Sequence, residues 1–152
     1  MNVIIRKAVI EEAEAIAQFN IAMAWETEKK VLPLETILGG VKALFHKPEA
    51  GFYLVAETSQ QIVGSLMITT EWSDWRNANF WWIQSVYILP AYRRQGIYRK
   101  LYETVKAMAQ TQTGVCGFRL YVEKENLPAQ QTYTSLGMLP THYLMFEEEC
   151  ES

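Results

Sequence analysis

A short basic run follows Tyr92 and contains a single glycine. Guanidinium groups bind phosphate oxygens through fixed charge and paired N–H donors. A glycine in the same run lets the backbone approach a ligand closely, because it has no Cβ. The run therefore predicts a diphosphate-binding turn. Its residues are Arg93, Arg94, Gln95, Gly96, Ile97, Tyr98 and Arg99.

The elements on either side would hold this turn at the end of a sheet. Phe80 to Leu89 is a dense run of aromatic and branched apolar residues, which is typical of a strand buried on both faces. Pro90 ends the strand because it donates no ladder hydrogen bond. An amphipathic helix follows, and the N–H groups and dipole at a helix start attract anions. An ordinary strand–helix connection with a solvated basic turn is the alternative.

The sequence contains neither Gly-x-x-x-x-Gly-Lys-Ser/Thr nor Gly-x-Gly-x-x-Gly, two other phosphate-binding patterns. Instead, Arg93-x-x-Gly96-x-Tyr98 after the strand end VYILP resembles the acetyl-CoA motif of the GNAT superfamily of N-acetyltransferases. The family has Gly or Ala where this chain has Tyr98. The resemblance implies that acetyl-CoA is the acyl donor and that the turn backbone holds its diphosphate. It also implies that one stretch of backbone takes the pantetheine arm and the oxyanion, namely Val86, Tyr87 and Ile88.

A second stretch, NLPAQQTYTSLGM, resembles the C-terminal motif of the same family. It places Asn126 and Tyr133 seven residues apart, followed by Leu136-Gly137. The resemblance implies that the Asn126 side chain contacts the cofactor and that the Tyr133 hydroxyl protonates the departing CoA thiolate. The alternative is structural, in which Asn126 caps a helix and Tyr133 packs that helix against the sheet.

Attack on a thioester also requires a neutral amine and a group that takes its proton. We predict Glu28 and Asp74 for this role, with the alternative that both are solvated surface charges. Five tryptophans lie near these acids in sequence, which suggests an aromatic, acidic pocket for a small cationic amine. Core packing or a dimer surface would equally explain the tryptophans. The tryptophans are Trp25, Trp72, Trp75, Trp81 and Trp82, and the other candidate polar groups are Glu26, Glu71 and Gln84.

Composition bounds the class of protein. The chain has 152 residues, of which 49% are apolar, so we expect one folded domain over residues 1–152. A net charge of −3 argues against broad binding to nucleic acid. No apolar run is long enough for a membrane span, and no signal peptide is recognisable, so we expect a cytoplasmic protein. Cys116 is expected to be buried at a strand start and Cys150 to lie in a loose tail, and no metal site is expected.

Turn signals and periodicity predict the order of the elements. We expect α/β (α+β) architecture, and the family resemblance implies a mixed, mostly antiparallel sheet of six to seven strands flanked by about four helices. The expected helices cover residues 10–28, 34–46, 97–113 and 128–136. The expected strands begin with residues 3–5 and continue with 52–57, 62–70, 80–89, 118–122 and 139–146.

These observations favour an N-acetyltransferase that moves an acetyl group from acetyl-CoA to a primary amine of a small molecule. Peptide N-termini and lysine side chains stay open as acceptors. A domain of the same fold that binds acyl-CoA without turnover is the first alternative. A protein-interaction domain without a CoA site, built around exposed tryptophans, is the second. A homodimer is compatible with this many aromatic residues.

Overall fold

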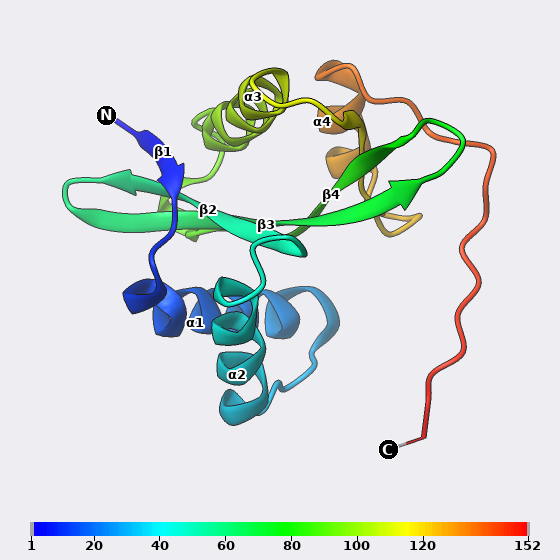
Figure 1. Cartoon of the computed structure of the whole chain (residues 1–152). Helices are drawn as coiled ribbons and strands as arrows, with labels where there is room; N and C mark the ends of the chain where they lie inside the picture. The colour runs from blue at the N-terminus through cyan, green and yellow to red at the C-terminus, as the bar shows by residue number, and fades with distance from the viewer. Residues whose placement is uncertain (1, 152) are drawn as a thin grey trace. The chain divides into compact units, whose positions relative to one another are not determined.

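A sheet of five strands in the order β1-β2-β3-β4-β5 organises the first part of the chain. The first four strands pair antiparallel and β5 pairs parallel to β4 (Figure 1). The mixed, mostly antiparallel sheet that we predicted is therefore confirmed, with five strands in place of six to seven. The strands are β1 Ile4–Lys7, β2 Gly51–Thr58, β3 Gln61–Ser73, β4 Ala78–Ile88 and β5 Val115–Arg119.

Helices cover both faces of this sheet. Helices α1 and α2 lie on one face and α3 lies on the other (Figure 1). The core between the sheet and the first two helices includes Ile16, Val41, Tyr53 and Val55. The helices are α1 Ala13–Glu28, α2 Leu34–Phe45 and α3 Ile97–Gln110, with short 3-10 helices η1 Ile10–Glu12 and η2 Pro90–Tyr92.

The structure is a computed structural model that describes residues 2–151, and it divides into two compact units. The first unit, Met1–Leu120, holds the whole sheet; the second, Tyr121–Ser152, holds α4 Leu127–Ser135. A single domain over residues 1–152 stays a prediction. No helix within the described range is long and apolar enough to cross a bilayer.

Two strand predictions need correction. The stretch Leu139–Phe146 is neither helix nor strand, although its composition favours a strand. A strand requires a hydrogen-bonded neighbour as well as a suitable composition, and Pro140 removes one donor. The last strand, β5, begins at Val115, three residues before the predicted start. Gly114, with φ 91°, makes the turn into it, and the Asn79 N–H donates to the Gly114 carbonyl.

The prediction for Cys116 is wrong. Cys116 is exposed, because β5 lies at the edge of the sheet. Cys150 is exposed in the second unit, where we predicted a loose tail.

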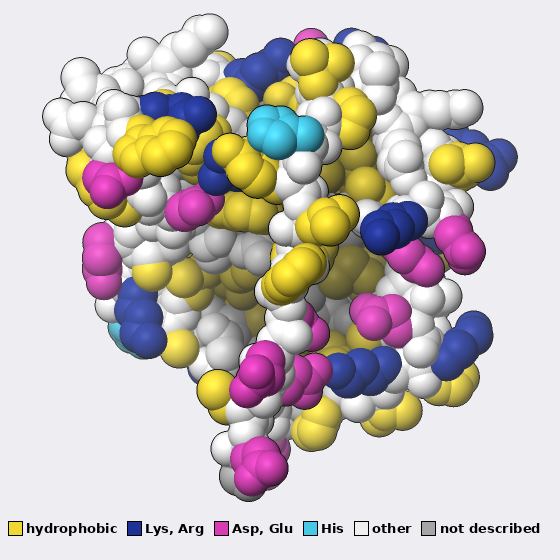
Figure 2. Space-filling model, turned by 90° about the vertical axis from the view of Figure 1, so that its right-hand side faces the viewer, with side chains coloured by type: hydrophobic (Ala, Val, Ile, Leu, Met, Phe, Trp, Pro, Cys, Tyr) yellow, Lys and Arg dark blue, Asp and Glu magenta, His cyan; other side chains and the backbone are white. Residues whose placement is uncertain are grey.

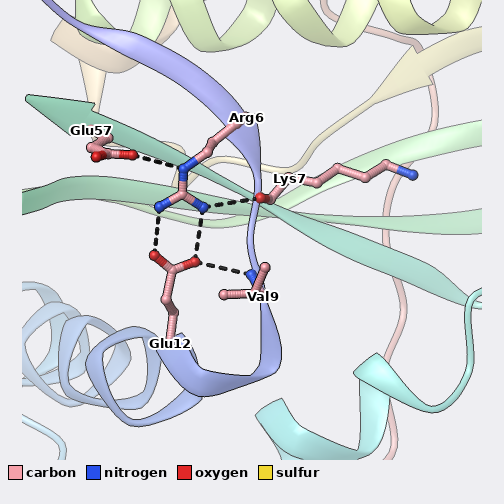
Figure 3. A network of polar contacts seen from close by, with 5 residues as sticks. All are labelled: Arg6, Lys7, Val9, Glu12 and Glu57. Atoms are coloured by element: carbon pink, nitrogen blue, oxygen red, sulfur yellow. Dashed lines mark hydrogen bonds and ion pairs between the residues drawn. The ribbon is translucent and has the colours of Figure 1, made fainter. Parts of the chain in front are cut away.

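A partly buried network of polar contacts ties the first strand to the 3-10 helix η1 (Figure 3). The Arg6 guanidinium donates to Glu57 at 2.8 Å and to both carboxylate oxygens of Glu12, at 3.0 and 2.7 Å. The Glu12 carboxylate also accepts the Val9 N–H, so it caps the start of η1. The hydrogen bond from Arg6 holds the pKa of Glu12 below its ordinary value of 4.5.

We expect Arg6→Met to lower the free energy of unfolding by about 1–2 kcal/mol at neutral pH, because it removes charge-assisted hydrogen bonds that are partly shielded from water. A carboxyl with a lowered folded-state pKa stabilises the fold above pH 4.5, and this contribution is lost as the pH falls through its folded pKa. The variant should therefore lose less stability on acidification. Urea unfolding at several pH values measures both effects, with exposed Lys30→Met as the control.

Candidate active site

A β-bulge interrupts β4 shortly before its end. Ser65 of β3 lies opposite Tyr87, whereas Met67 lies opposite Gln84, so β4 carries one extra residue between these pairs. Ser85 has φ 53°, in the left-handed region that non-glycine residues rarely adopt. A bulge of this kind bends a strand and redirects the groups that follow it.

Beyond the bulge, β4 has a neighbour on one side. Its pairing with β5 ends at Trp82 and Arg119 within the described residues. The Leu89 N–H donates to the Val63 carbonyl, so Leu89 faces β3. Alternate residues of a strand direct their backbone groups to opposite sides, and the N–H groups of Val86 and Ile88 therefore face away from β3. These donors can bind an extended polar ligand or a developing oxyanion.

The predicted turn follows this strand end after the short helix η2. Arg94 and Gly96 have φ values of 62° and 80°, and Gly96 is the N-cap of α3. The first intrahelical bond runs from the Lys100 N–H to the Gly96 carbonyl, so the N–H groups before Lys100 point out of the helix end. A Cβ built on Gly96 would meet no atom within 4 Å. The space in front of the turn is therefore open to an anion.

Tyr98, the departure from the family motif, packs along its own helix. Its ring stacks on Tyr102, one helical turn later, with centroids 6.4 Å apart and planes 5° apart. Residues four apart on a helix are neighbours on its surface, which explains this contact. The side chain is half-buried, whereas Arg94, Gln95 and Arg99 are exposed at the turn.

Arg93 is engaged within the protein. Its Nε donates to the Ile88 carbonyl and its Nη2 donates to Glu26, both at 2.8 Å. Its guanidinium carbon lies 5.2 Å from the centre of the Tyr87 ring. The Tyr87 hydroxyl donates to the other oxygen of Glu26 at 2.5 Å. The hydrogen bonds from Tyr87 and Arg93 lower the pKa of Glu26, while burial and the Glu26 contact raise the pKa of Tyr87.

The candidate acids and tryptophans lie in different places. Asp74 is exposed in the turn between β3 and β4, before Ala78, whereas Glu26 is bonded to Tyr87 at the other end of β4. That length of strand spans about 30 Å. Asp74 and the acids at the end of α1 therefore lie toward opposite ends of β4, and the choice of general base between Glu28 and Asp74 stays a prediction. Glu28 is exposed in the last turn of α1.

The other polar candidates have partners, and one tryptophan belongs to the core. Glu71 accepts from Trp82 Nε1 at 2.8 Å and from Arg119 at 2.9 Å. Gln84 accepts from the Thr69 hydroxyl at 2.6 Å. Trp81 is buried and makes edge contacts with the Phe52 and Phe118 rings. The remaining tryptophans are Trp25 in α1, and Trp72 and Trp75 at the β3–β4 hairpin, all exposed.

In the second unit, Asn126 is the N-cap of α4 and Tyr133 lies in the last turn of the same helix. The Asn126 side chain accepts the Ala129 N–H at 3.2 Å, as expected of a helix N-cap. Tyr133 is half-buried, and burial raises the pKa of its phenol. The phenol therefore stays protonated further into the alkaline range, as a proton donor requires.

Sequence reasoning missed the bulge and the Glu26 contacts, although both leave a signal. Gln84 and Ser85 are consecutive polar residues within an apolar strand, which breaks the alternation of a regular ladder. Glu26 lies in the last turn of α1, where the helix dipole disfavours a negative charge. An acid in that position suggests a cationic or hydroxyl partner elsewhere in the chain.

Residues 9–138 match the model of the acetyltransferase (GNAT) family. A possible acetyltransferase from Clostridium difficile 630 is 43% identical, with all of both chains covered and a TM-score of 0.92. A ribosomal-protein-alanine N-acetyltransferase from Brucella melitensis is 13% identical, with 99% and 100% covered and a TM-score of 0.79. The aminoglycoside N-acetyltransferase AAC(6')-Iy, in complex with a bisubstrate analogue, is 14% identical, with 99% of each chain covered and a TM-score of 0.79. A search of curated proteins found no match.

Proposed function

Because this chain belongs to the acetyltransferase (GNAT) family, a family of acyltransferases, we propose that it transfers an acetyl group from acetyl-CoA to a primary amine of a small molecule. One observation carries the proposal. Only the short helix η2 separates the bulged end of β4 from the open turn before α3, so donors for a thioester and for a diphosphate follow one another along one stretch of backbone. AAC(6')-Iy, a protein of this fold, binds a bisubstrate analogue that contains CoA, which supports acetyl-CoA as the donor.

Each part of the proposed site has one task. The N–H groups at Gly96 and the start of α3 bind the diphosphate, and the exposed Arg94 and Arg99 add positive charge. The N–H groups of Val86 and Ile88 take the pantetheine arm and stabilise the oxyanion that forms on the thioester carbonyl. These donors require no reorganisation, because the fold already directs them away from β3.

The proposed chemistry is direct attack. The neutral amine nitrogen bonds to the carbonyl carbon, the C–S bond breaks, and the thiolate takes a proton from the Tyr133 hydroxyl. The proton lost by the amine passes to a base through water. Glu28 is our proposal for that base, since it lies at the same end of the sheet as the β4 terminus, and Asn126 is our proposal for a further cofactor contact.

A turnover assay tests the proposed function. The wild-type protein with acetyl-CoA should release free CoA when small primary amines are supplied, measured by a thiol reagent. Peptides with free N-termini and lysine side chains belong in the same panel, and faster turnover on them would reassign the acceptor class. Tight acetyl-CoA binding without turnover on any amine would indicate a sensor instead.

Two further predictions from the sequence remain proposals, a homodimer and a cytoplasmic location. The segment after α4 exposes large apolar side chains that self-association would shield, including Tyr143, Leu144 and Phe146, which is 90% exposed. Figure 2 shows hydrophobic side chains at many places on the face that it presents. Light scattering would give twice the mass of one chain for a homodimer, and cell fractionation would locate the protein.

A further inference from the structure

Arg93 begins the cofactor motif, yet the bonds that it makes point back into the protein. Its Nε reaches the Ile88 carbonyl and its Nη2 reaches Glu26, each at 2.8 Å. Its guanidinium also lies over the Tyr87 ring. Arg93 therefore links the end of β4 and the start of the turn to the end of α1, which lies far away in sequence.

Glu26 holds this link together. One carboxylate oxygen accepts the Tyr87 hydroxyl at 2.5 Å and the other accepts Arg93. The Tyr87 ring is itself fixed by Phe19 of α1, with centroids 5.5 Å apart. The helix dipole disfavours a negative charge in the last turn of α1, and that turn contains no basic residue to offset this effect. The two partners supply the missing compensation, so the negative charge of Glu26 is stable in this position.

The location of these contacts explains what they can do. Tyr87 and Ile88 follow the bulge, in the part of β4 that has left its β5 neighbour. A strand with a ladder on one side only is less restrained than one paired on both sides. Arg93 then precedes Arg94, whose left-handed backbone shapes the turn. Restraint at Ile88 and Arg93 therefore fixes the stretch on both sides of the short η2 helix.

We propose that Glu26 is a positioning residue that, through Arg93 and Tyr87, fixes the end of β4 and the diphosphate-binding turn in the geometry that acetyl-CoA requires. This inference rests on the proposed function for its ligand. In this proposal, Arg93 supports acetyl-CoA binding by holding the backbone of the turn in place, and not by contacting the diphosphate itself.

The competing assignment gives an effect of opposite sign. If Arg93 bound the diphosphate directly, Glu26 would compete for its guanidinium. Removal of a negative charge beside an anionic cofactor would then strengthen binding. Under our proposal, removal of the same charge releases the turn and weakens binding, because the ligand must then order it.

Calorimetry with acetyl-CoA distinguishes the two. We expect Glu26→Gln and Arg93→Gln each to weaken binding by about tenfold, and the double variant to be no weaker than either single variant, since both remove one restraint. Glu14→Gln is the control, because it makes the same charge change at an exposed residue near the other end of the same helix, and the proposed mechanism does not use Glu14. At physiological salt it should alter affinity by no more than about twofold.

Unchanged or tighter binding by Glu26→Gln would overturn the proposal, as would additive losses in the double variant. Hydrogen exchange of the free proteins gives a readout without cofactor. The amides of residues 89–98 should exchange faster in Glu26→Gln and in Tyr87→Phe than in Glu14→Gln, and equal rates would refute the restraint. If the wild-type protein bound no acetyl-CoA while these rates still differed, the proposed function would fail and the restraint would stand.

Discussion

Gly96→Glu should abolish measurable acetyl-CoA binding and leave a folded protein. In the free protein a Cβ at Gly96 enters open space, and this is the space that the diphosphate would occupy. A carboxylate there faces two phosphate charges at close range, and a like-charge contact costs several kcal/mol. We expect at least about a hundredfold loss of affinity, because each 1.4 kcal/mol is a factor of ten. Calorimetry measures the loss directly.

The chain offers a matched control in Gly114→Glu. The φ of Gly114 is 91°, close to the 80° of Gly96. A Cβ built on Gly114 also meets nothing within 4 Å. Both variants therefore carry the same strain of a side chain at positive φ, about 1–2 kcal/mol, and the same added charge. Gly114 precedes β5, away from the turn. Equal affinities for the two variants would contradict a diphosphate site at Gly96.

The parts of the fold that local chemistry determines could be predicted from the sequence. The helix at residues 34–46 and the one that starts at Ile97 were predicted within a residue or so at their starts, because periodicity and Pro or Gly signals mark them. The turn at Gly96 was predicted for the same reason. Its φ of 80° requires a residue that tolerates the left-handed region.

The parts that depend on distant partners could not be predicted. Whether residues 139–146 form a strand depends on a neighbouring strand, which composition does not specify. The separation of Asp74 from Glu26 depends on the length of β4 between them, which sequence proximity of acids and tryptophans does not reveal. The role of Arg93 illustrates both limits. The residue type of Arg93 indicated a positive charge that could bind a phosphate. Its contact with Glu26 exists only because the fold brings these two distant residues together.

Tyr133→Phe should lower kcat by about a hundredfold or more, with acetyl-CoA affinity retained, because general acid catalysis contributes about 10²–10⁴. The substitution removes one oxygen and keeps the ring. The thiolate would then have to leave without a proton. In the wild type, kcat should fall as the pH rises through the raised pKa of Tyr133, since a phenolate cannot donate a proton. The variant should lack this alkaline decline.

Tyr143→Phe provides the control, because it makes the same change at an exposed tyrosine of the same unit. Stopped-flow turnover at several pH values, beside calorimetric affinities, separates two explanations. If Tyr133 only packs α4, its variant should lose thermal stability and affinity together and keep the pH profile of the wild type. If the phenol donates the proton, the affinity for acetyl-CoA is unchanged in the variant, whereas kcat falls and its decline at high pH disappears. Only the proton transfer depends on the hydroxyl.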